Sequence, residues 1–383
     1  MELTKCKLGE LITQRREKND GSDLPICGVS KDGLIPPKQI DADTSIYNVF
    51  YRDDFIFNPA RMELNSIAIN DKFDRAICSS LYEVFYVHRT DLLLPHFLKL
   101  IVKQPWFTRY CEFLGQGSAR EYCRFNNISE IEIEFPSIEE QRKIVQAYKT
   151  ITDRIELKKK INDNLTEQCL VDYSLMLNGY TTESEDLPED WSKGSIGSYC
   201  DVKSGYAFKS DWWTTEGYKV IKIANIVNNS IDLDSCDCVI AEHANKANNF
   251  FVQSGDILIA MTGATTGKIG MVPLCNEPIV VNQRVGKFFL GENPIEKAPF
   301  LFSTLLYSRV VRHLQPDGTA GSAQDNLSAD NIKDVAIVLP EQSIIDTFNQ
   351  KHIPHIKTIM SNCAEIRMLN KLAETVLQTL SSR

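Results

Sequence analysis

The most constraining feature of this sequence is an internal repeat, in which one segment occurs twice at a constant separation. The first copy opens with Gly-Ser-Ala at Gly117 and ends at Pro136, and the second opens with Gly-Ser-Ala at Gly321 and ends at Pro340. Both the openings (321 − 117) and the prolines (340 − 136) are 204 residues apart. A fixed internal period has to be considered before any local pattern. Two copies predict a tandem duplication, in which each unit is a variable body followed by a long helix.

A long helical pattern follows each of the two prolines. After the first proline, Ser137 and Glu140 form a capping box, because the serine oxygen accepts from free N–H groups of the first turn and the glutamate reaches back. After the second proline, Glu341 and Gln342 follow directly, which shortens the start of the helix.

Apolar residues recur in both helical segments at the spacing of one helix face. In the second helix they follow a seven-residue grid that only His352 interrupts, and such a repeat forms a seam for another helix. Pro354 lies inside this pattern and predicts a kink or a late start of the helix. We expect the two helices to pair antiparallel as a coiled-coil rod; the alternative is two separate helices, each packed on a globular body. The residues expected at the helix and subunit interface are Ile144, Tyr148, Ile151, Ile155, Ile345, Ile359, Ile366 and Ala373.

The segments before the two helices predict two similar α/β (α+β) domains. Short strand patterns occur in matching pairs at 24–29 and 219–224, at 54–58 and 256–260, at 76–87 and 278–289, and at 131–135 and 335–339. A helix-like stretch occurs in each body, at 95–113 and at 299–314. Mixed strands and helices with short connections are typical of such domains. The predicted organisation is a first body at 1–136, a spacer helix at 137–180, a second body at 187–340 and a second spacer helix at 341–383.

Composition narrows the class of protein. With 383 residues, 43% of them hydrophobic, the chain can bury two separate cores. The net charge of −9 argues against a free-standing nucleic-acid binder, but it fits a protein that shares its DNA contacts with partner subunits. The sequence shows neither a signal peptide nor a run of about 18 apolar residues, so we expect a cytoplasmic protein without a membrane span.

The cysteine and glycine motifs predict neither a metal site nor a catalytic site. The eleven cysteines are scattered, which is typical of reduced thiols, and Cys236 and Cys238 lack the spacing of a zinc site. The segment 262–269 has one residue too few between its glycines for a phosphate loop, and Ile269 stands where such a loop needs a hydroxyl. The segment 113–117 imitates a methyltransferase loop, but the motif that would stack a flipped base is missing.

The repeat and four short motifs resemble the specificity (S) subunit of type I restriction–modification enzymes over essentially the whole chain. The motifs are the opening Leu8-Gly9-Glu10, the strand and loop at 255–259, the twin Gly-Ser-Ala loops and the Pro-x-x-Glu-Gln helix starts in modified form. The resemblance implies that each body is a target recognition domain that reads one half of a split DNA site, and that the helices act as a ruler between the halves. Because the two bodies differ strongly outside their shared framework, an asymmetric site is expected.

The resemblance also implies partners. These are double-stranded DNA, two methyltransferase (modification) subunits docked on the helices, and restriction subunits that add a translocase and a nuclease. The chain itself is then non-catalytic and binds no cofactor, whereas the complex uses S-adenosylmethionine, ATP and Mg²⁺. Two alternatives remain open: a specificity module of a solitary methyltransferase or of another phage-defence complex, and a coiled-coil scaffold without a DNA role.

Polar and basic side chains in the loops of both bodies are the candidates for DNA contact. Arginine pairs with guanine through two hydrogen bonds, and asparagine or glutamine pairs with adenine in the same way. An arginine can equally serve in an ion pair, and an aromatic residue can belong to the core. The candidates in the first body are Arg15, Arg16, Asn58, Arg61, Gln116, Ser118, Arg120 and Arg124. Those in the second body are Lys203, Tyr206, Lys209, Thr262, Thr265, Thr266, Lys268, Gln283, Arg284, Ser322, Gln324 and Asn326.

Overall fold

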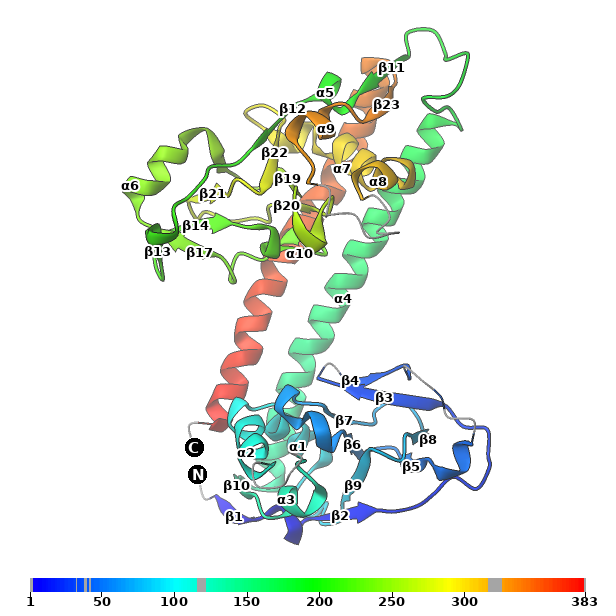
Figure 1. Cartoon of the computed structure of the whole chain (residues 1–383), viewed down its shortest axis with the longest axis vertical. Helices are drawn as coiled ribbons and strands as arrows, with labels where there is room; N and C mark the ends of the chain where they lie inside the picture. The colour runs from blue at the N-terminus through cyan, green and yellow to red at the C-terminus, as the bar shows by residue number, and fades with distance from the viewer. Residues whose placement is uncertain are drawn as a thin grey trace. The chain divides into compact units, whose positions relative to one another are not determined.

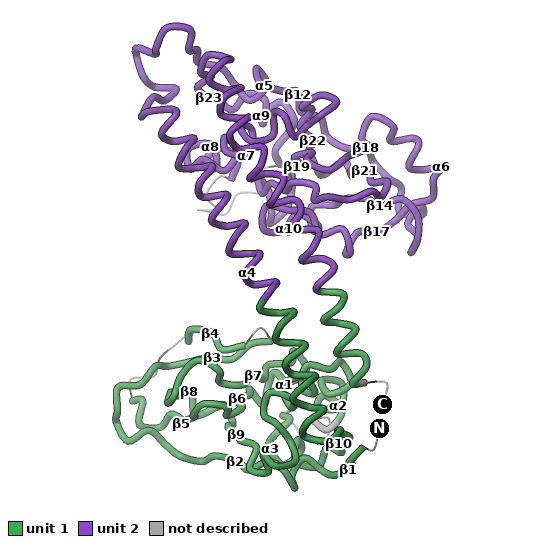
Figure 2. The backbone as a smooth tube through the Cα atoms, turned by 180° about the vertical axis from the view of Figure 1, so that it is seen from behind, with its two compact units in different colours: residues 1–153, 370–383 green, residues 154–369 purple. Residues whose placement is uncertain are grey.

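The computed structural model of the chain describes residues 3–31, 33–37, 40, 43–115, 122–315 and 326–381. The chain divides into two compact units, which are Met1–Asp153 with Asn370–Arg383, and Arg154–Leu369 (Figure 2). Two long helices, α4 (Ile138–Leu177) and α10 (Gln342–Ser381), contribute to both units (Figure 1). The remaining strands and short helices belong to one unit each.

Within its described residues, the first unit contains two four-stranded sheets and a two-stranded ladder. The first sheet is antiparallel and has the order β2 (Ile12–Arg15), β9 (Glu83–Val87), β6 (Phe55–Phe57), β7 (Ile67–Ile69). The second sheet has the order β4 (Gly33–Ile35), β3 (Ile26–Ser30), β8 (Arg75–Cys78), β5 (Asn48–Tyr51), and its β3–β8 pair is parallel. The ladder joins β1 (Thr4–Lys7) to β10 (Glu132–Phe135).

Helices and an aromatic core complete the first unit. The α-helices confined to this unit are α1 (Pro95–Val102), α2 (Pro105–Gly115) and α3 (Phe125–Ser129), and its 3₁₀ turns are Leu8–Glu10, Thr44–Ile46 and Pro59–Leu64. Side chains of neighbouring strands form the core, where the buried Phe55 and Phe85 rings stack with centroids 5.0 Å apart. Aromatic pairs of this kind stabilise a core beyond their buried area.

The second unit repeats this order of strands. Its larger sheet has the order β12 (Asp201–Ser204), β22 (Val285–Phe289), β19 (Ile257–Ala260), β20 (Ile269–Met271), β16 (Asn229–Ile231), β15 (Ile226–Val227). Its other sheet has the order β13 (Trp213–Thr214), β17 (Asp237–Val239), β14 (Tyr218–Ile221), β21 (Ile279–Val281), β18 (Phe251–Val252). A ladder joins β11 (Ser192–Ser195) to β23 (Ala336–Leu339).

In the second unit, α7, α8 and α9 follow the strands of the two sheets in the same order as α1, α2 and α3 do in the first unit, and further short helices are added. Its α-helices besides α4 and α10 are α5 (Ile196–Tyr199), α6 (Ala241–Ala244), α7 (Ala298–Leu306), α8 (Ser308–Leu314) and α9 (Ala329–Lys333). Its 3₁₀ turns are Ser210–Trp212, Ile223–Asn225, Asn245–Phe250, Gly263–Thr265 and Pro294–Glu296.

The duplication predicted from the repeat is confirmed at the level of topology. The order β2–β9–β6–β7 corresponds to β12–β22–β19–β20, and the parallel pair β3–β8 corresponds to the parallel pair β14–β21. Each unit therefore pairs strands that are distant in sequence in the same way, as a mixed α/β fold.

Two expected elements are divided in both units. The patterns at 76–87 and 278–289 each form two strands, because polar turns break them, and the two strands then join different sheets. The helix-like stretches at 95–113 and 299–314 each form two short helices. In the first unit the break falls at Pro105, whose ring fixes the backbone and removes a hydrogen-bond donor.

The two long helices pair antiparallel within the second unit, as predicted. Arg154 near the start of this part of α4 donates to Glu365 at 2.6 Å, whereas Tyr173 near the end of α4 meets Phe348 with ring centroids 6.0 Å apart. Of the two outcomes expected at Pro354, the late start is wrong, because α10 begins at Gln342 and continues through the proline, and the kink stays a prediction. Pro354 lacks only its own N–H group, and the neighbouring helix and core hold the remaining turns in place.

Burial along the predicted seam is uneven. Among the expected interface residues, those that are buried are Ile155, Ile345, Ile359 and Ala373, and those that are half-buried are Ile144, Tyr148, Ile151 and Ile366. Polar pairs interrupt the apolar seam: Asn362 Nδ2 donates to Asn162 Oδ1 at 2.8 Å, and Lys158 Nζ lies 2.7 Å from Glu365. Such polar contacts require their partner opposite, so they fix the register of the two helices.

A buried aspartate occupies the same place in both units, directly before the strands β6 and β19. Asp54 pairs with Arg15 at 2.6 Å, and Asp256 pairs with Lys287 at 2.9 Å. Burial raises the pKa of both carboxyl groups, and the neighbouring cations offset that effect only in part. The Asp256–Lys287 pair ties the start of β19 to the adjacent strand β22, and the Asp54–Arg15 pair ties the start of β6 to β2, which lies beyond β9 in the same sheet.

We expect Asp256→Ala to lower the free energy of unfolding by about 3–5 kcal/mol, because it leaves the charge of Lys287, whose side chain is only 12% exposed, without its counter-charge. Urea denaturation followed by tryptophan fluorescence measures the change. The matched control is the double variant Asp256→Ala with Lys287→Met, which removes both charges and should recover most of the loss. Equal stability of the single variant and the unmodified chain would contradict this role of the pair.

Candidate nucleic-acid interface

In the second unit, the end of β12, the start of β22 and the end of β19 lie at one end of the sheet, and three chain segments meet there. Tyr206 follows β12, Gln283 and Arg284 lie between β21 and β22, and Thr262 follows β19. The Gln283 N–H donates to Tyr206 O and the Met261 N–H donates to Arg284 O, both at 2.9 Å. The fold thus brings these sequence-predicted candidates together, with Gln283 and Arg284 exposed.

The loop after β19 is held against the end of α8. Gly267 has a φ of +79°, and a β-carbon at this position would lie 2.2 Å from Leu314 O, so only glycine fits. Gln315 Nε2 also donates to Gly267 O at 3.3 Å. This fixed turn leaves the side chain of Lys268 exposed.

The threonines of this loop differ in their hydrogen bonds. Thr266 Oγ1 donates to Gly263 O at 2.7 Å. Thr262 Oγ1 and Thr265 Oγ1 are covered but have no hydrogen-bond partner among the described residues. Covered polar groups are almost always paired in a folded domain, so two unpaired hydroxyls mark a loop whose polar groups the fold alone does not satisfy.

The second repeated loop adjoins the same end of the sheet. The Leu327 N–H donates to Met261 O at 2.9 Å, which places the exposed Asn326 next to the β19 loop. Ser322 and Gln324 lie outside the described residues.

The corresponding end of the first unit's sheet carries basic side chains. Arg16 follows β2, and Asn58 caps the 3₁₀ turn Pro59–Leu64, which contains the exposed Arg61. Asn58 Oδ1 accepts from the Ala60 N–H at 3.1 Å, so its side chain holds the turn in place.

Arg124 joins this surface from the start of α3. The Cys123 N–H donates to Pro59 O at 3.0 Å, and Arg124 Nη1 lies 3.1 Å from Glu83 on β9. Glu83 also accepts from the Phe125 N–H at 2.8 Å, so its carboxylate orients both α3 and the arginine. Gln116, Ser118 and Arg120 lie outside the described residues.

Arg15 is partly buried and stabilises the fold of the first unit. Its guanidinium pairs with Asp54 at 2.6 Å and lies between the rings of Tyr51 and Tyr86, 4.7 and 4.6 Å from their centroids. This is the ion-pair alternative stated above for the arginines, and we leave Arg15 out of the proposed DNA contacts.

Two lysine candidates of the second unit have partners in their own neighbourhood. Lys203 lies within β12 rather than at its end, and its ammonium is 3.2 Å from Asp201. The Lys209 ammonium lies 5.5 Å from the centroid of the Trp212 ring, which is the range of a cation–π contact. Lys268 is also exposed, and among the described residues it has neither an ion pair nor a cation–π contact.

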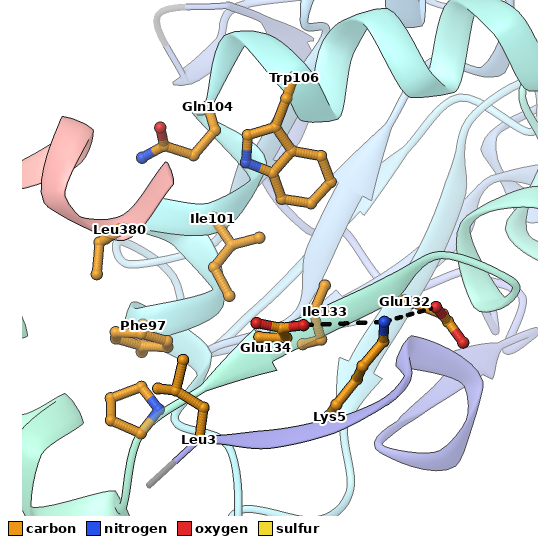
Figure 3. Close-up of a pocket in the computed structure, with 11 residues that line it drawn as sticks. Leu3, Lys5, Phe97, Ile101, Gln104, Trp106, Glu132, Ile133, Glu134 and Leu380 are labelled. Atoms are coloured by element: carbon orange, nitrogen blue, oxygen red, sulfur yellow. Dashed lines mark ion pairs between the residues drawn. The ribbon is translucent and has the colours of Figure 1, made fainter. Parts of the chain in front are cut away.

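A pocket of about 320 Å³ lies elsewhere in the first unit (Figure 3). β1, β10, α1 and the ends of α2 and α10 line it, and Lys5 within it pairs with Glu132 at 3.2 Å and with Glu134 at 3.8 Å. None of the candidate DNA-binding residues lines this pocket, and acidic side chains on its rim disfavour a phosphate backbone.

The sequence analysis missed one cluster of reactive side chains. Cys169 on α4 lies beside His352 and His355 on α10, although 183 residues separate the cysteine from the first histidine. Burial raises the pKa of the Cys169 thiol to about 12 and lowers the pKa of His352. The only signals in the sequence are the three-residue spacing of the histidines and the interruption of the apolar grid by His352.

Among the described residues, no helix is long and apolar enough to cross a membrane.

Comparison with known proteins identifies the family. A family model described as the type I restriction modification DNA specificity domain matches residues 6–167 and again residues 188–374. The MjaVIII specificity subunit of a type I restriction enzyme from Methanocaldococcus jannaschii is 28% identical over 187 residues, covering 46% of this chain and 44% of that subunit. The MjaIX specificity subunit from the same organism is 23% identical over 313 residues, covering 76% of this chain and 69% of that subunit. This chain thus matches less than half the length of the first relative.

A solved structure supports the same fold. The S subunit of a type I restriction–modification system from M. genitalium has a TM-score of 0.59 and 16% identity, covering 99% of this chain and 96% of that chain. At this identity the similarity concerns the fold alone, and it extends over both units. Since the two matches of the family model span most of the sequence, the chain belongs to the type I restriction–modification DNA specificity (S subunit) family and carries the family's domain twice.

Proposed function

We propose that this chain selects the DNA target of a type I restriction–modification complex, and that each unit reads one half of a split double-stranded site. One observation carries the proposal: both units have the same strand order, and both gather polar and basic loops at the same end of the corresponding sheet. The side chains at that end differ, with Arg61 and Arg124 in the first unit and Thr265, Lys268 and Gln283 in the second. A shared framework with different reading groups fits an asymmetric site.

The chain does not catalyse the reaction in this proposal, and its charge explains why it needs partners. A net charge of −9 opposes binding to the DNA phosphates, so further positive charge comes from the modification subunits. These subunits bring S-adenosylmethionine and the methyl transfer, and restriction subunits bring ATP and Mg²⁺. The complex acts on DNA in the cytoplasm.

The surfaces of the long helices support the docking of two modification subunits. Exposed apolar residues occur in pairs four positions apart, as an amphipathic helix presents them to a partner. The pairs on α4 are Leu157 with Ile161 and Val171 with Leu175, and the pair on α10 is Met368 with Leu372.

Methylome sequencing of cells with and without the chain tests the proposal. We expect one split, asymmetric motif to lose its methylation completely when the chain is absent. Mass measurement of the purified complex should give two modification subunits for each copy of this chain. Methylation that persists without the chain would overturn the proposal and would favour the scaffold alternative.

A further inference from the structure

The Cys169, His352 and His355 cluster lies inside the second unit, where α4 and α10 are packed together. Cys169 and His352 are buried, and His355 is half-buried. One donor atom of each side chain lies close to the other two: Cys169 Sγ is 3.4 Å from His352 Nδ1 and 4.0 Å from His355 Nδ1, and the two Nδ1 atoms are 2.8 Å apart. Two helices distant in sequence thus supply a thiol and two imidazoles to one position.

These separations suit a tetrahedral metal ion. With zinc–nitrogen distances near 2.0–2.1 Å and a zinc–sulfur distance near 2.3 Å, donor atoms in a tetrahedron lie about 3.3–3.6 Å apart. Each of the three observed separations departs from that range by no more than about 0.5 Å, which small side-chain rotations can absorb. One cysteine with two histidines is a ligand set that zinc accepts, and three protein ligands leave a fourth position for water.

A fourth residue, Asp172, lies beside one of the proposed ligands. His352 Nε2 lies 3.2 Å from Asp172 Oδ2, and the same carboxylate oxygen lies 2.8 Å from Lys351 Nζ. A carboxylate beside one imidazole nitrogen favours the tautomer with the proton on that nitrogen, so the lone pair stands on Nδ1, toward Cys169 and His355. Metal-binding histidines in proteins commonly have such a carboxylate behind them.

Packing of the helix seam alone does not explain why these three polar side chains are buried together. His352 stands at a position where the seven-residue pattern calls for an apolar side chain, and it is fully buried. Without a cation, one of the two Nδ1 atoms must carry a proton and donate it to the other across 2.8 Å. The Cys169 thiol lies against the same pair of nitrogens, 3.4 Å from His352 Nδ1. A shared cation satisfies all three lone pairs at once, and the half-buried His355 gives it a route from solvent.

We propose that Cys169, His352 and His355 bind one Zn²⁺ ion, which joins α4 to α10 within the second unit, and that Asp172 positions His352. The ion fixes the helix pair at one register between the aromatic contact of Tyr173 with Phe348 and the pair Asn162–Asn362. Removal of the ion loosens this part of the helix pair without touching the strand-end loops.

The test uses the full chain, purified without a histidine tag, dialysed against a chelator and then titrated with ZnCl₂. We expect one zinc per chain by elemental analysis, and with CoCl₂ a charge-transfer absorption of a cobalt–thiolate bond. Zinc at about 100 times its dissociation constant should raise Tm by about 5–10 °C. Cys169→Ser and His355→Asn should remove the stoichiometric ion, the absorption and the Tm shift, and Asp172→Asn should weaken zinc binding by about 10–100-fold.

Matched controls separate this site from the other thiols and histidines. Cys275→Ser and His313→Asn change the same residue types outside the cluster and should leave zinc binding unchanged. Circular dichroism of the metal-free variants shows whether they are folded, so loss of zinc binding is not confused with unfolding. The proposal is overturned if the unmodified chain retains no zinc, or if Cys169→Ser and His355→Asn retain it as well as the controls do.

Discussion

Insertion of four residues into both long helices, after Asp153 in α4 and after Leu369 in α10, is expected to abolish methylation of the native DNA site. Methylation should move to sites with the same two half-sites and a spacer longer by about one to two base pairs. Four residues lengthen a helix by about 6 Å, and base pairs follow one another at about 3.4 Å. The insertions fall at the boundary between the two units, so the packing within each unit is kept.

The control for this experiment is an insertion into α4 alone. A single insertion lengthens one helix and not the other, so the two units cannot both keep their packing of α4 on α10. In the first unit, Ile144 and Val145 share a core with Leu380, and in the second Arg154 pairs with Glu365. We expect a loss of stability and of assembly for this variant. If the double insertion left the spacer unchanged, the helices would not set the distance between half-sites.

Substitutions at the strand ends are expected to change one half of the site each. Arg61→Ala should relax a base preference in one half only, and Lys268→Ala should do so in the other half only. If the side chain bonds a base edge, its loss costs about 1–3 kcal/mol, or roughly 5–150-fold in affinity for the correct base. If it contacts phosphate alone, affinity should fall evenly across sequences. The slope of the logarithm of the binding constant against the logarithm of the salt concentration should then become shallower by about 1.

The two substitutions serve as controls for each other, and Lys193→Ala adds a third. Lys193 is exposed on β11, which pairs with β23 and does not belong to the β12–β22–β19 sheet, so it tests the effect of charge alone. Methylation-site mapping and DNA titration at several salt concentrations measure all three. If Arg61→Ala changed the base preference of both halves, a single composite DNA surface would replace the model of two readers.

Much of the architecture could be predicted from the sequence because local or periodic residue patterns determine it. The repeat around Gly117 and Gly321 predicted two equivalent units, and the spacing of apolar residues predicted two long paired helices. The strand patterns also occur where expected, since alternation and turn residues act over a few positions. The same reasoning placed the loop of Thr262, whereas Gln283 was expected inside the strand pattern at 278–289 and lies in the turn that divides it.

Other features follow only from contacts between distant segments. Arg15 looks like any exposed arginine in sequence, and its role depends on Asp54, 39 residues further along, which is buried by the sheet. Turns break long patterns such as 76–87, but the sequence does not show that the two halves join different sheets, because that depends on the order of the strands. Periodicity cannot show such pairings, because they depend on which distant surfaces are buried together.

The contact between α4 and α10 shows most clearly which features the sequence predicts and which depend on tertiary contacts. The seven-residue grid predicted a mainly apolar contact and treated His352 as an interruption. Only the antiparallel register of α4 against α10 brings Cys169 and His355 to that histidine and sets Asp172 behind it. The sequence determined that two helices pair, because apolar spacing is local; the tertiary structure decided which polar groups meet across the pair, because register depends on packing along its whole length.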